Sequence, residues 1–367
     1  MTSPGPDRLL VNLFDYERAA AATLPAGAFD YIAGGVADEV SLRRARGVFD
    51  DLLLRPRTMV DVGRCDTATT VLSQPVSCPI LVAPSGDHGI AHPDGEKATV
   101  RGAAAADTLM IVSSGSTFPL EEIAAAADGS LWFHLGLLRD RKAAARLLAR
   151  AQDSGYRAVC LTVDHKVTGL RERNVRNGWV SPPPVNLAGL VEVSTADWAQ
   201  GSTLARRADQ VFDRSATWGY LEEIAAMTSL PLVAKGILRG DDAAAAVAHG
   251  AAAVVVSDHG ARQLDTTVSP IEALPEVVAA VGSRAEVYVD GGFRRGTDVI
   301  KALALGARAV LIGRPVIYGL AVGGSAGVAA VLRLLRAEFE TAMAMCGAAA
   351  VADLRPDLVR TRASSAR

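Results

Sequence analysis

Eight short apolar runs recur along this 367-residue sequence, and Ala-rich segments with helical periodicity separate them. Most runs are too short for helices and are rich in Val, Ile and Leu, which is typical of strands buried on both faces. The runs are Pro79–Pro84, Leu109–Ser114, Leu131–Leu137, Ala158–Asp164, Leu230–Gly236, Ala252–Asp258, Glu286–Gly292 and Ala309–Pro315. The helical segments include Glu96–Asp107, Arg141–Ser154, Asp241–His249 and Gly296–Leu305. Eight strand–helix units predict an α/β fold, a (β/α)₈ TIM barrel, with a doubly wound open sheet as the alternative.

The regular units leave three other parts of the chain. The segment before the barrel predicts a helical extension, with helices at Phe14–Leu24 and Ala37–Asp51. A long loop follows the fourth strand, from Asp164 to Leu230, and its length suits a mobile active-site lid. The end of the chain is polar and basic from Arg355, and we expect it to fray. We therefore expect a single domain over 1–367, with an N-terminal helical extension over 1–78, a barrel over 79–348 and a tail over 349–367.

Composition excludes several classes of protein. The 38 Lys and Arg residues against 40 Asp and Glu give a net charge of −2, which is not the signature of a nucleic-acid-binding protein. The N-terminus lacks the pattern of a signal peptide, and no apolar stretch approaches the roughly 20 residues of a membrane helix. The four cysteines are scattered, without the spacing of a metal site. We expect a cytoplasmic protein that binds neither nucleic acid, membrane nor metal.

Polar side chains stand at or just past the C-terminal ends of the apolar runs. In a TIM barrel this rim holds the active site, and the loops after the seventh and eighth strands commonly bind phosphate. The run Ser257–Asp265 places a histidine three residues before an arginine, which suits a base and a cation acting on a carboxylate. The run Asp290–Gly296 places glycines beside arginines, which suits a phosphate. The sequence predicts an enzyme that holds a phosphorylated cofactor beside an anionic substrate.

From about Phe29 to about Gly347 the sequence resembles the FMN-dependent α-hydroxy acid oxidase/dehydrogenase family, which includes glycolate oxidase, lactate oxidase and mandelate dehydrogenase. The motifs that carry the resemblance are Asp30-Tyr31…Gly35, Leu54–Arg57, His92–Glu96, Leu161–Asp164, Lys235-Gly236, Ser257–Asp265, Asp290–Asp298 and Ala304–Val316. They occur in order on the predicted strands, so the match is specific. The resemblance implies FMN as cofactor, oxidation of a 2-hydroxy acid to a 2-oxo acid, O₂ as acceptor and a homotetramer.

The resemblance also implies roles for individual residues. His259 would be the base, Asp164 would orient it, and Lys235 would lie beside the flavin where negative charge develops. Arg262 and Arg171 would clamp the substrate carboxylate, and Tyr31 would add a hydrogen bond. The residues implied for FMN are Ser85, Gly86, Ser113, His134, Thr162, Lys235, Ser257, Asp290, Gly291, Gly292, Arg294, Gly313 and Arg314.

Departures from the family pattern gather around the substrate. Gly136 stands where a tyrosine is usual, which predicts extra space in the pocket and one donor fewer. The other departures are His134, Asp87, His88, Asp258, Leu170 beside Arg171, and His165-Lys166. We predict a larger or more polar substrate than glycolate, from bacterial specialised metabolism. The alternative is drift within an ordinary glycolate- or lactate-type enzyme.

Other functions stay open. One is an FMN enzyme that oxidises an amine or carries out an oxidative decarboxylation, and another is a flavin-binding protein without activity. The retained His259, Arg262 and Arg171 favour a carboxylate substrate, and the intact Asp164 and Lys235 favour an active enzyme. A membrane-bound dehydrogenase would need an apolar insertion, and Pro182–Gly219 is too polar to supply one.

Overall fold

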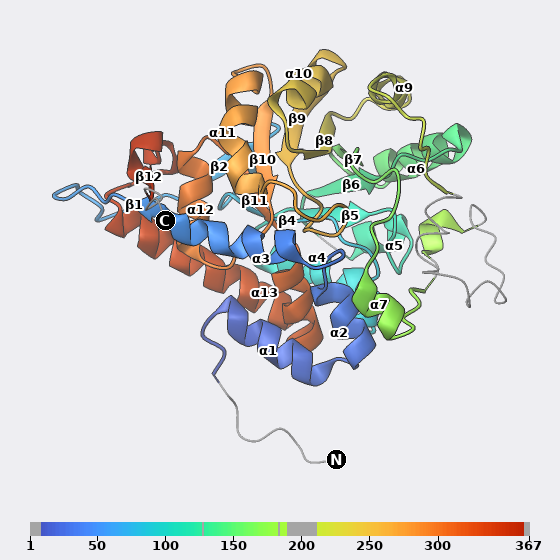
Figure 1. Cartoon of the computed structure of the whole chain (residues 1–367), viewed down its shortest axis with the longest axis horizontal. Coiled ribbons are helices and arrows are strands. Elements are labelled where there is room, and N and C mark those ends of the chain that lie inside the picture. Colours follow the sequence, from blue (N-terminus) through green and yellow to red (C-terminus); the bar gives the residue numbers. More distant parts are fainter. Residues whose placement is uncertain (1–8, 127, 183, 189–210, 363–367) are drawn as a thin grey trace.

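The computed structural model describes residues 9–126, 128–182, 184–188 and 211–362. Its centre is a closed barrel of eight parallel strands in the order β4-β5-β6-β7-β8-β9-β10-β11 (Figure 1). The strands are β4 (Ile80–Val82), β5 (Met110–Ser113), β6 (Leu131–Leu135), β7 (Val159–Thr162), β8 (Leu232–Ile237), β9 (Ala251–Val256), β10 (Glu286–Asp290) and β11 (Ala309–Ile312). Each strand overlaps the apolar run that predicted it. The predicted TIM barrel is confirmed.

Helices follow the strands and cover the outside of the barrel. They are α4 (Gly95–Ala105), α5 (Leu120–Ala125), α6 (Arg141–Asp153), α7 (Glu172–Arg176), α9 (Gly219–Ala225), α10 (Gly240–Ala248), α11 (Pro270–Val281), α12 (Gly296–Ala304) and α13 (Arg314–Met345). Local sequence sets where several of them begin. The Asp140 side chain accepts from Lys142 N and Ala143 N at the start of α6, and Ser269 N donates to Glu272 Oε2 at 3.1 Å at the start of α11.

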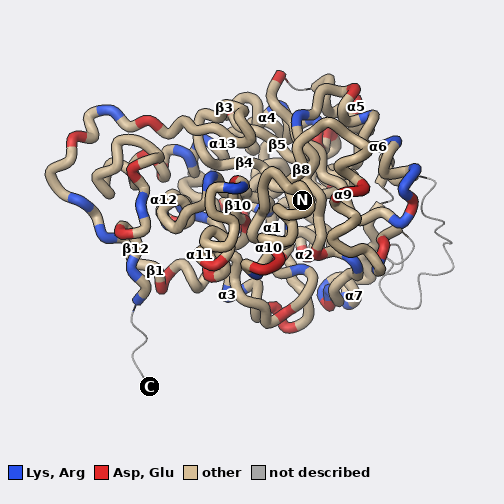
Figure 2. Tube along the Cα trace, turned by 90° about the horizontal axis from the view of Figure 1, so that it is seen from above, with Lys and Arg blue, Asp and Glu red and all other residues tan. Residues whose placement is uncertain are grey.

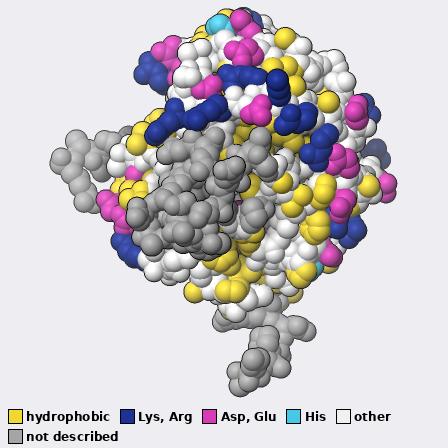
Figure 3. Space-filling model, turned by 90° about the vertical axis from the view of Figure 1, so that its right-hand side faces the viewer, with side chains coloured by type: hydrophobic (Ala, Val, Ile, Leu, Met, Phe, Trp, Pro, Cys, Tyr) yellow, Lys and Arg dark blue, Asp and Glu magenta, His cyan; other side chains and the backbone are white. Residues whose placement is uncertain are grey.

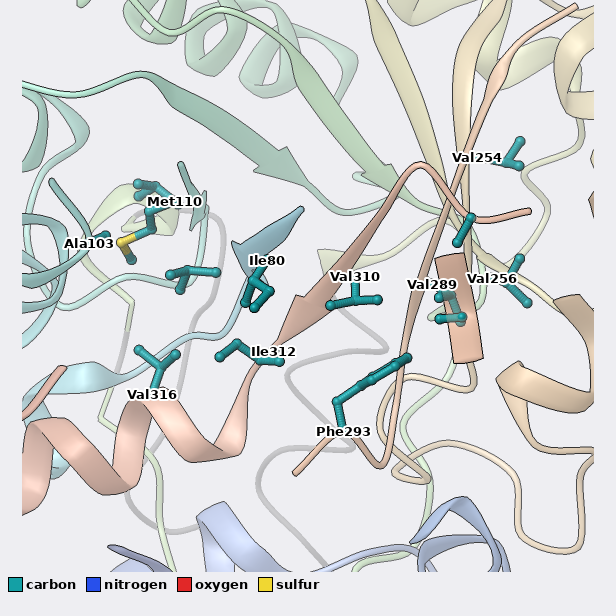
Figure 4. Close-up of a cluster of buried hydrophobic side chains, with 14 of the residues drawn as sticks. Ile80, Ala103, Met110, Val254, Val256, Val289, Phe293, Val310, Ile312 and Val316 are labelled. Atoms are coloured by element: carbon teal, nitrogen blue, oxygen red, sulfur yellow. The ribbon is translucent and has the colours of Figure 1, made fainter. Parts of the chain in front are cut away.

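Alternate residues of each strand face opposite sides, so the core has two layers. Ile80, Val310 and Ile312 point outward and pack beneath the helices with Val316 of α13 (Figure 4). The residues between them belong to a second cluster, inside the barrel, which includes Leu81, Leu311, Trp132 and Tyr288. Both faces of the strands are therefore buried. This double burial is why the runs are continuously apolar instead of alternating.

The N-terminal extension is helical only as far as Asp51. The helix α1 (Leu13–Thr23) matches the first predicted one, α2 (Ala26–Ala33) was not predicted, and the second predicted helix is α3 (Val40–Gly47) continued by a 3₁₀ turn. Three short strands follow: β1 (Leu52–Leu54), β2 (Thr69–Val71) and β3 (Gln74–Val76). Helices α1 and α2 pack against α13, which joins the extension to the end of the barrel (Figure 1).

The prediction that the chain frays from Arg355 is wrong for the described part of the tail. Strand β12 (Val359–Thr361) pairs antiparallel with β1, and Leu358 beside it is 1% exposed. A buried leucine and a strand ladder hold this segment in spite of its charge. The predicted lid extends over residues 164–230, and its part over 189–210 lies outside the described residues.

Helix α13 is long and apolar enough to cross a membrane, with a mean hydropathy of 1.7 over its most apolar window, although the sequence suggested no such stretch. Of that window, 67% is buried, and non-helical backbone at Gly323 and Gly324 kinks the helix. It packs against α1, α4 and α12, as a core helix does. Basic and acidic side chains are mixed along the chain trace (Figure 2) and on the face shown in Figure 3.

Candidate active site

A cavity of about 330 Å³ lies at the C-terminal end of the barrel. Its lining includes every residue predicted for the site except Asp164 and Ser257, and each of these two bonds to a lining residue. The predicted residues in the lining are Tyr31, Ser85, Gly86, Ser113, His134, Gly136, Thr162, Arg171, Lys235, His259, Arg262, Asp290, Gly291, Gly292, Arg294, Gly313 and Arg314. Residues from both ends of the sequence therefore meet in one place. The volume is in the range of small-molecule sites.

His259 and Asp164 form a hydrogen-bonded pair. His259 Nδ1 lies 3.0 Å from Asp164 Oδ1, so a neutral ring carries its proton on Nδ1 and leaves Nε2 as an acceptor. Three successive residues from His259 to Ala261 have left-handed backbone (φ 58, 66 and 57°), and His259 N donates to Ser257 Oγ at 3.0 Å. This sharp turn after β9 fixes the ring. Burial lowers the pKa of His259, although Asp164 opposes the shift, so the imidazole is neutral near pH 7.

Lys235 lies near the C-terminal end of β8 and is 4% exposed. Its Nζ lies 3.0 Å from Asp290 Oδ2 and donates to Ser257 Oγ at 2.9 Å. Burial acts to lower the pKa of Lys235, but Asp290 and Asp164 outweigh it and raise the pKa above its ordinary value. The side chain is therefore a fixed cation in the cavity wall.

Three neighbouring strands present a row of hydrogen-bonding side chains. His134 Nε2 lies 2.7 Å from Thr162 Oγ1, and His134 Nδ1 lies 3.4 Å from Ser113 Oγ. Burial lowers the pKa of His134 to about 3, with Lys235 adding to the shift, so the ring is neutral. These side chains can donate hydrogen bonds to, and accept them from, the polar edge of a planar ligand without placing a charge beside it.

Arg262 and Arg171 bring positive charge to the side of the cavity formed by α2 and α7. Arg262 Nη1 donates to Tyr31 O at 2.8 Å and to Gly34 O at 3.0 Å, which caps the end of α2. Burial lowers the pKa of Arg262 to about 9, and it also lowers that of Arg171, so Arg262 is still a cation at neutral pH. Arg171 is 7% exposed, and its Nε has no partner among the described residues. An anionic ligand would satisfy it.

The glycine turn after β10, which is predicted to bind the phosphate, lines the cavity. Gly291 and Gly292 have φ of 93° and 80°, and a Cβ on Gly292 would lie 1.9 Å from Ala45 O of α3. Any side chain at position 292 is excluded there. Arg294 follows the turn; its Nε is buried, makes no hydrogen bond within the described chain and lies 3.6 Å from Glu17 Oε2.

Arg314 was expected to hold the phosphate, and the structure gives it other bonds. Its Nε donates to Ile32 O at 3.0 Å, and its Nη2 donates to Gly34 O and Gly260 O at 2.9 and 2.8 Å. Burial lowers the pKa of Arg314 to about 10. Arg314 thus ties α2 to the turn that carries the base, and it still lines the cavity.

The departures in the first barrel loop fall into two kinds. Asp87 lines the cavity and accepts a hydrogen bond from Tyr31 Oη at 2.8 Å. His88 does not line the cavity: its ring nitrogens lie 2.9 Å from Ser85 Oγ and 2.9 Å from Thr99 Oγ1, inside the protein. The suggestion that His88 bears on the substrate is therefore wrong, because both ring nitrogens are used within the fold.

The expectation that Gly136 leaves extra space is also wrong. A Cβ at this position would lie 2.5 Å from Phe212 Cε1, so the phenyl ring occupies the volume of the missing side chain. Phe212 supplies an aromatic ring without a hydroxyl. No sequence pattern indicated this contact, because Phe212 comes from the far end of the long loop and its partner is a glycine.

Asp258 lies behind the cavity and is 5% exposed. Neither of its carboxylate oxygens has a hydrogen-bond partner in the described chain. Burial, reinforced by the charge of Asp290, raises the pKa of Asp258 to about 6. The charged form of this carboxylate, which lies beside the turn at Gly291, is therefore unfavourable in the folded protein.

Comparison with known proteins identifies the family of the chain. The sequence matches the FMN-dependent dehydrogenase family over residues 20–361. The chain belongs to that family. It is 49% identical to an L-lactate oxidase of Nostoc sp. over 351 residues, and the alignment covers 94% of this chain and 96% of the relative. It is 44% identical to a peroxisomal (S)-2-hydroxy-acid oxidase of Oryza sativa subsp. japonica, covering 98% and 99%.

Solved structures of this FMN-dependent family are also similar. A mandelate oxidase with (S)-4-hydroxymandelic acid aligns with a TM-score of 0.90 at 41% identity, covering 96% of this chain and 98% of that one. A soluble mutant of the (S)-mandelate dehydrogenase from Pseudomonas putida aligns with a TM-score of 0.88 at 36% identity, covering 96% and 100%. The chain is therefore an FMN-dependent oxidoreductase that acts on a CH–OH group.

The residues present fit FMN. A Cβ on Gly86 would lie 2.8 Å from Gly115 O, so this part of the cavity wall is shaped by backbone, as close approach of a flat ring requires. The buried Nε of Arg294, beside the Gly291–Gly292 turn, is a donor that a phosphate would satisfy. Ser113, His134, Thr162 and Lys235 would hold the ring system.

Proposed function

We propose that the enzyme oxidises a 2-hydroxy acid to the 2-oxo acid, with O₂ as the electron acceptor. The observation that carries the proposal is the His259–Asp164 pair, held 3.0 Å apart at a cavity that Arg171 and Arg262 also line. A neutral base and two arginines in the cavity wall suit a substrate that has a carboxylate next to the reacting carbon. The names of the relatives, which include lactate and mandelate oxidases, support both the substrate class and the acceptor.

The proton moves through His259. Arg171 and Arg262 hold the carboxylate with Tyr31 beside them, which directs the hydroxyl-bearing carbon toward His259. Nε2 accepts a proton from the substrate, and Asp164 stabilises the imidazolium that results. The chemistry that FMN would supply when bound is acceptance of the two electrons and of the second proton released from the CH–OH group. Lys235 places a fixed positive charge in the wall where negative charge would develop.

The test is an anaerobic screen of 2-hydroxy acids that follows bleaching of the bound flavin. We expect bulkier acids to bleach it faster than glycolate, followed by reoxidation when air is admitted. If the flavin stays oxidised with every 2-hydroxy acid but is bleached by amines, the carboxylate-based proposal is wrong. Slow reoxidation in air would contradict O₂ as the acceptor.

We further propose a cytoplasmic homotetramer. The family resemblance supports the assembly, and the mixed surface charge is compatible with it. Light scattering on the eluting protein gives the mass of the assembly directly, and a mass of one chain would contradict the proposal.

A further inference from the structure

The cavity lining contains a polar group and an apolar group of side chains, called here its polar side and its apolar side. Tyr31, Asp87, Arg171 and Arg262 make the polar side, where a carboxylate would bind. The apolar side contains Ile90, Leu187, Val211 and Phe212. A carboxylate bound by the polar group leaves the apolar side chains available to the substituent on C2.

His165 connects the base to Phe212. The ring centroids of His165 and His259 are 5.2 Å apart, and those of His165 and Phe212 are 4.6 Å apart. His165 Nε2 lies 3.1 Å from Thr168 Oγ1, and burial lowers the pKa of His165, so the ring is neutral. The uncharged rings of His165 and Phe212 therefore pack one behind the other, and His165 contacts the base His259.

Phe212 is held firmly although it comes from a long loop. Its segment forms an antiparallel bridge with Leu138: Arg139 N donates to Val211 O at 2.8 Å, and Asp213 N donates to Leu137 O at 2.7 Å. Arg141 adds an ion pair to Asp213 at 2.8 Å. The phenyl ring stands over Gly136, where a Cβ would lie 2.5 Å from Phe212 Cε1. Position and shape are thus fixed by residues from two barrel units.

We propose that Phe212, backed by His165, determines substrate specificity by forming the wall on which a planar apolar substituent at C2 of the 2-hydroxy acid packs. This inference rests on the proposed function and narrows it to 2-hydroxy acids with an aryl substituent. Aromatic rings pack favourably in offset or edge-to-face geometry. A methyl substituent, as in lactate, leaves the wall largely uncovered.

The experiment compares racemic mandelate with racemic lactate as reductants of the holoenzyme, without oxygen. The measured quantity is the rate constant of flavin reduction divided by the dissociation constant, for each acid. We expect the natural enzyme to favour mandelate. Phe212→Ala should lower the mandelate-to-lactate ratio by about 10- to 200-fold, the range for a hydrophobic pocket contact. Phe212→Leu keeps most of the volume without the planar ring, and it should lower the ratio less.

Trp218→Ala is the matched control, because Trp218 is an aromatic residue of the same returning segment that does not line the cavity. Its ratio should equal that of the natural enzyme. A natural enzyme that favours lactate overturns the inference. So does a Phe212→Ala variant that loses both acids equally, or a Trp218→Ala variant that behaves like it.

A second measurement separates this inference from the proposed function. Phenylacetate and propionate lack the hydroxyl, so neither can be oxidised, and binding is followed by the change in the flavin spectrum. If phenylacetate binds more tightly than propionate and this difference is lost in Phe212→Ala, the wall formed by Phe212 is supported. This holds even if no 2-hydroxy acid bleaches the flavin, and in that case only the proposed function fails. Equal binding of the two acids in both proteins overturns the wall whatever the reduction experiments show.

Discussion

At the scale of single residues, charge is controlled by burial and by the choice of neighbour. His259 is neutral because burial lowers its pKa, and Asp164 keeps the ring oriented. Lys235 is more deeply buried and stays charged because Asp290 lies 3.0 Å away. The same barrel rim therefore holds a neutral base and a permanent cation.

His259→Ala should slow flavin reduction by about 10²–10⁴-fold while FMN stays bound, because a positioned base contributes that much and His259 is one of many lining residues. Stopped-flow absorbance measures the reduction, and the visible spectrum reports FMN content. His249→Ala is the control, since that histidine pairs with Glu222 on the surface. Reduction at the natural rate would remove His259 from the proposed mechanism.

Asp258→Asn should stabilise the protein at alkaline pH. The pKa of Asp258 rises from 3.8 to about 6 on folding, so the folded state holds the proton longer and the free energy of unfolding falls as pH rises from 4 to 6. An asparagine removes that loss, which is worth about 1–3 kcal/mol at pH 8 and little at pH 4. Thermal unfolding at both pH values tests this. A variant stabilised equally at pH 4 and 8 would contradict the charge argument.

At the scale of elements, α3 of the extension supports the glycine turn and α12 of the barrel. Arg46 donates to Asp298 Oδ1 at 3.0 Å and to Gly292 O at 3.0 Å. Asp298, 1% exposed, also accepts from Arg294 N and Arg295 N. The buried carboxylate of Asp298 thus bonds both to Arg46 of α3 and to the backbone that follows the glycine turn.

Arg46→Met should destabilise the protein by about 1–3 kcal/mol, because it leaves the buried Asp298 with fewer partners, and it should weaken FMN retention. Arg44→Met is the control: its ion pair with Glu272 is on the surface, with the arginine 55% exposed, and is worth about 0–1 kcal/mol. Urea unfolding gives both values. Equal effects from the two variants would mean that α3 contributes nothing specific to the turn.

Local pattern was enough to predict the barrel, because each strand lies in a short apolar run, and polar residues at the ends of several runs predicted its active-site rim. The family resemblance was needed for Tyr31, His134 and Arg171. What the sequence did not reveal depends on distant contacts. Phe212 fills the space above Gly136, and Leu358 is buried where β12 meets β1. Nothing in the residues around Gly136 or Arg355 indicates those partners. The prediction that His88 bears on the substrate was wrong for the same reason, since its ring nitrogens contact Ser85 and Thr99.

At the scale of the whole molecule, the cavity is closed by the extension as well as by the barrel. Tyr31 and Ile32 of α2 line it together with residues from the barrel strands. FMN bound there touches both parts, so it should stabilise their association.

Adding FMN to flavin-depleted protein should raise the thermal midpoint, by the equivalent of about 2.7 kcal/mol when FMN is at 100 times its dissociation constant. Riboflavin should raise it less, because it has no phosphate for Arg294 and the glycine turn. In Arg294→Met the advantage of FMN over riboflavin should shrink while the riboflavin effect stays. Equal stabilisation by both flavins would remove the phosphate assignment.

The packing of α1 and α2 on α13, and of Ala45 on Gly292, also sets an order of events during translation. The ribosome makes α1–α3 first, whereas the glycine turn, α12 and α13 emerge last. The early helices therefore wait without their docking surface while the barrel strands are synthesised. The cofactor pocket is complete only when α13 has left the exit tunnel. A nascent chain cut short immediately before α13 would contain all eight barrel strands and still be unable to retain FMN.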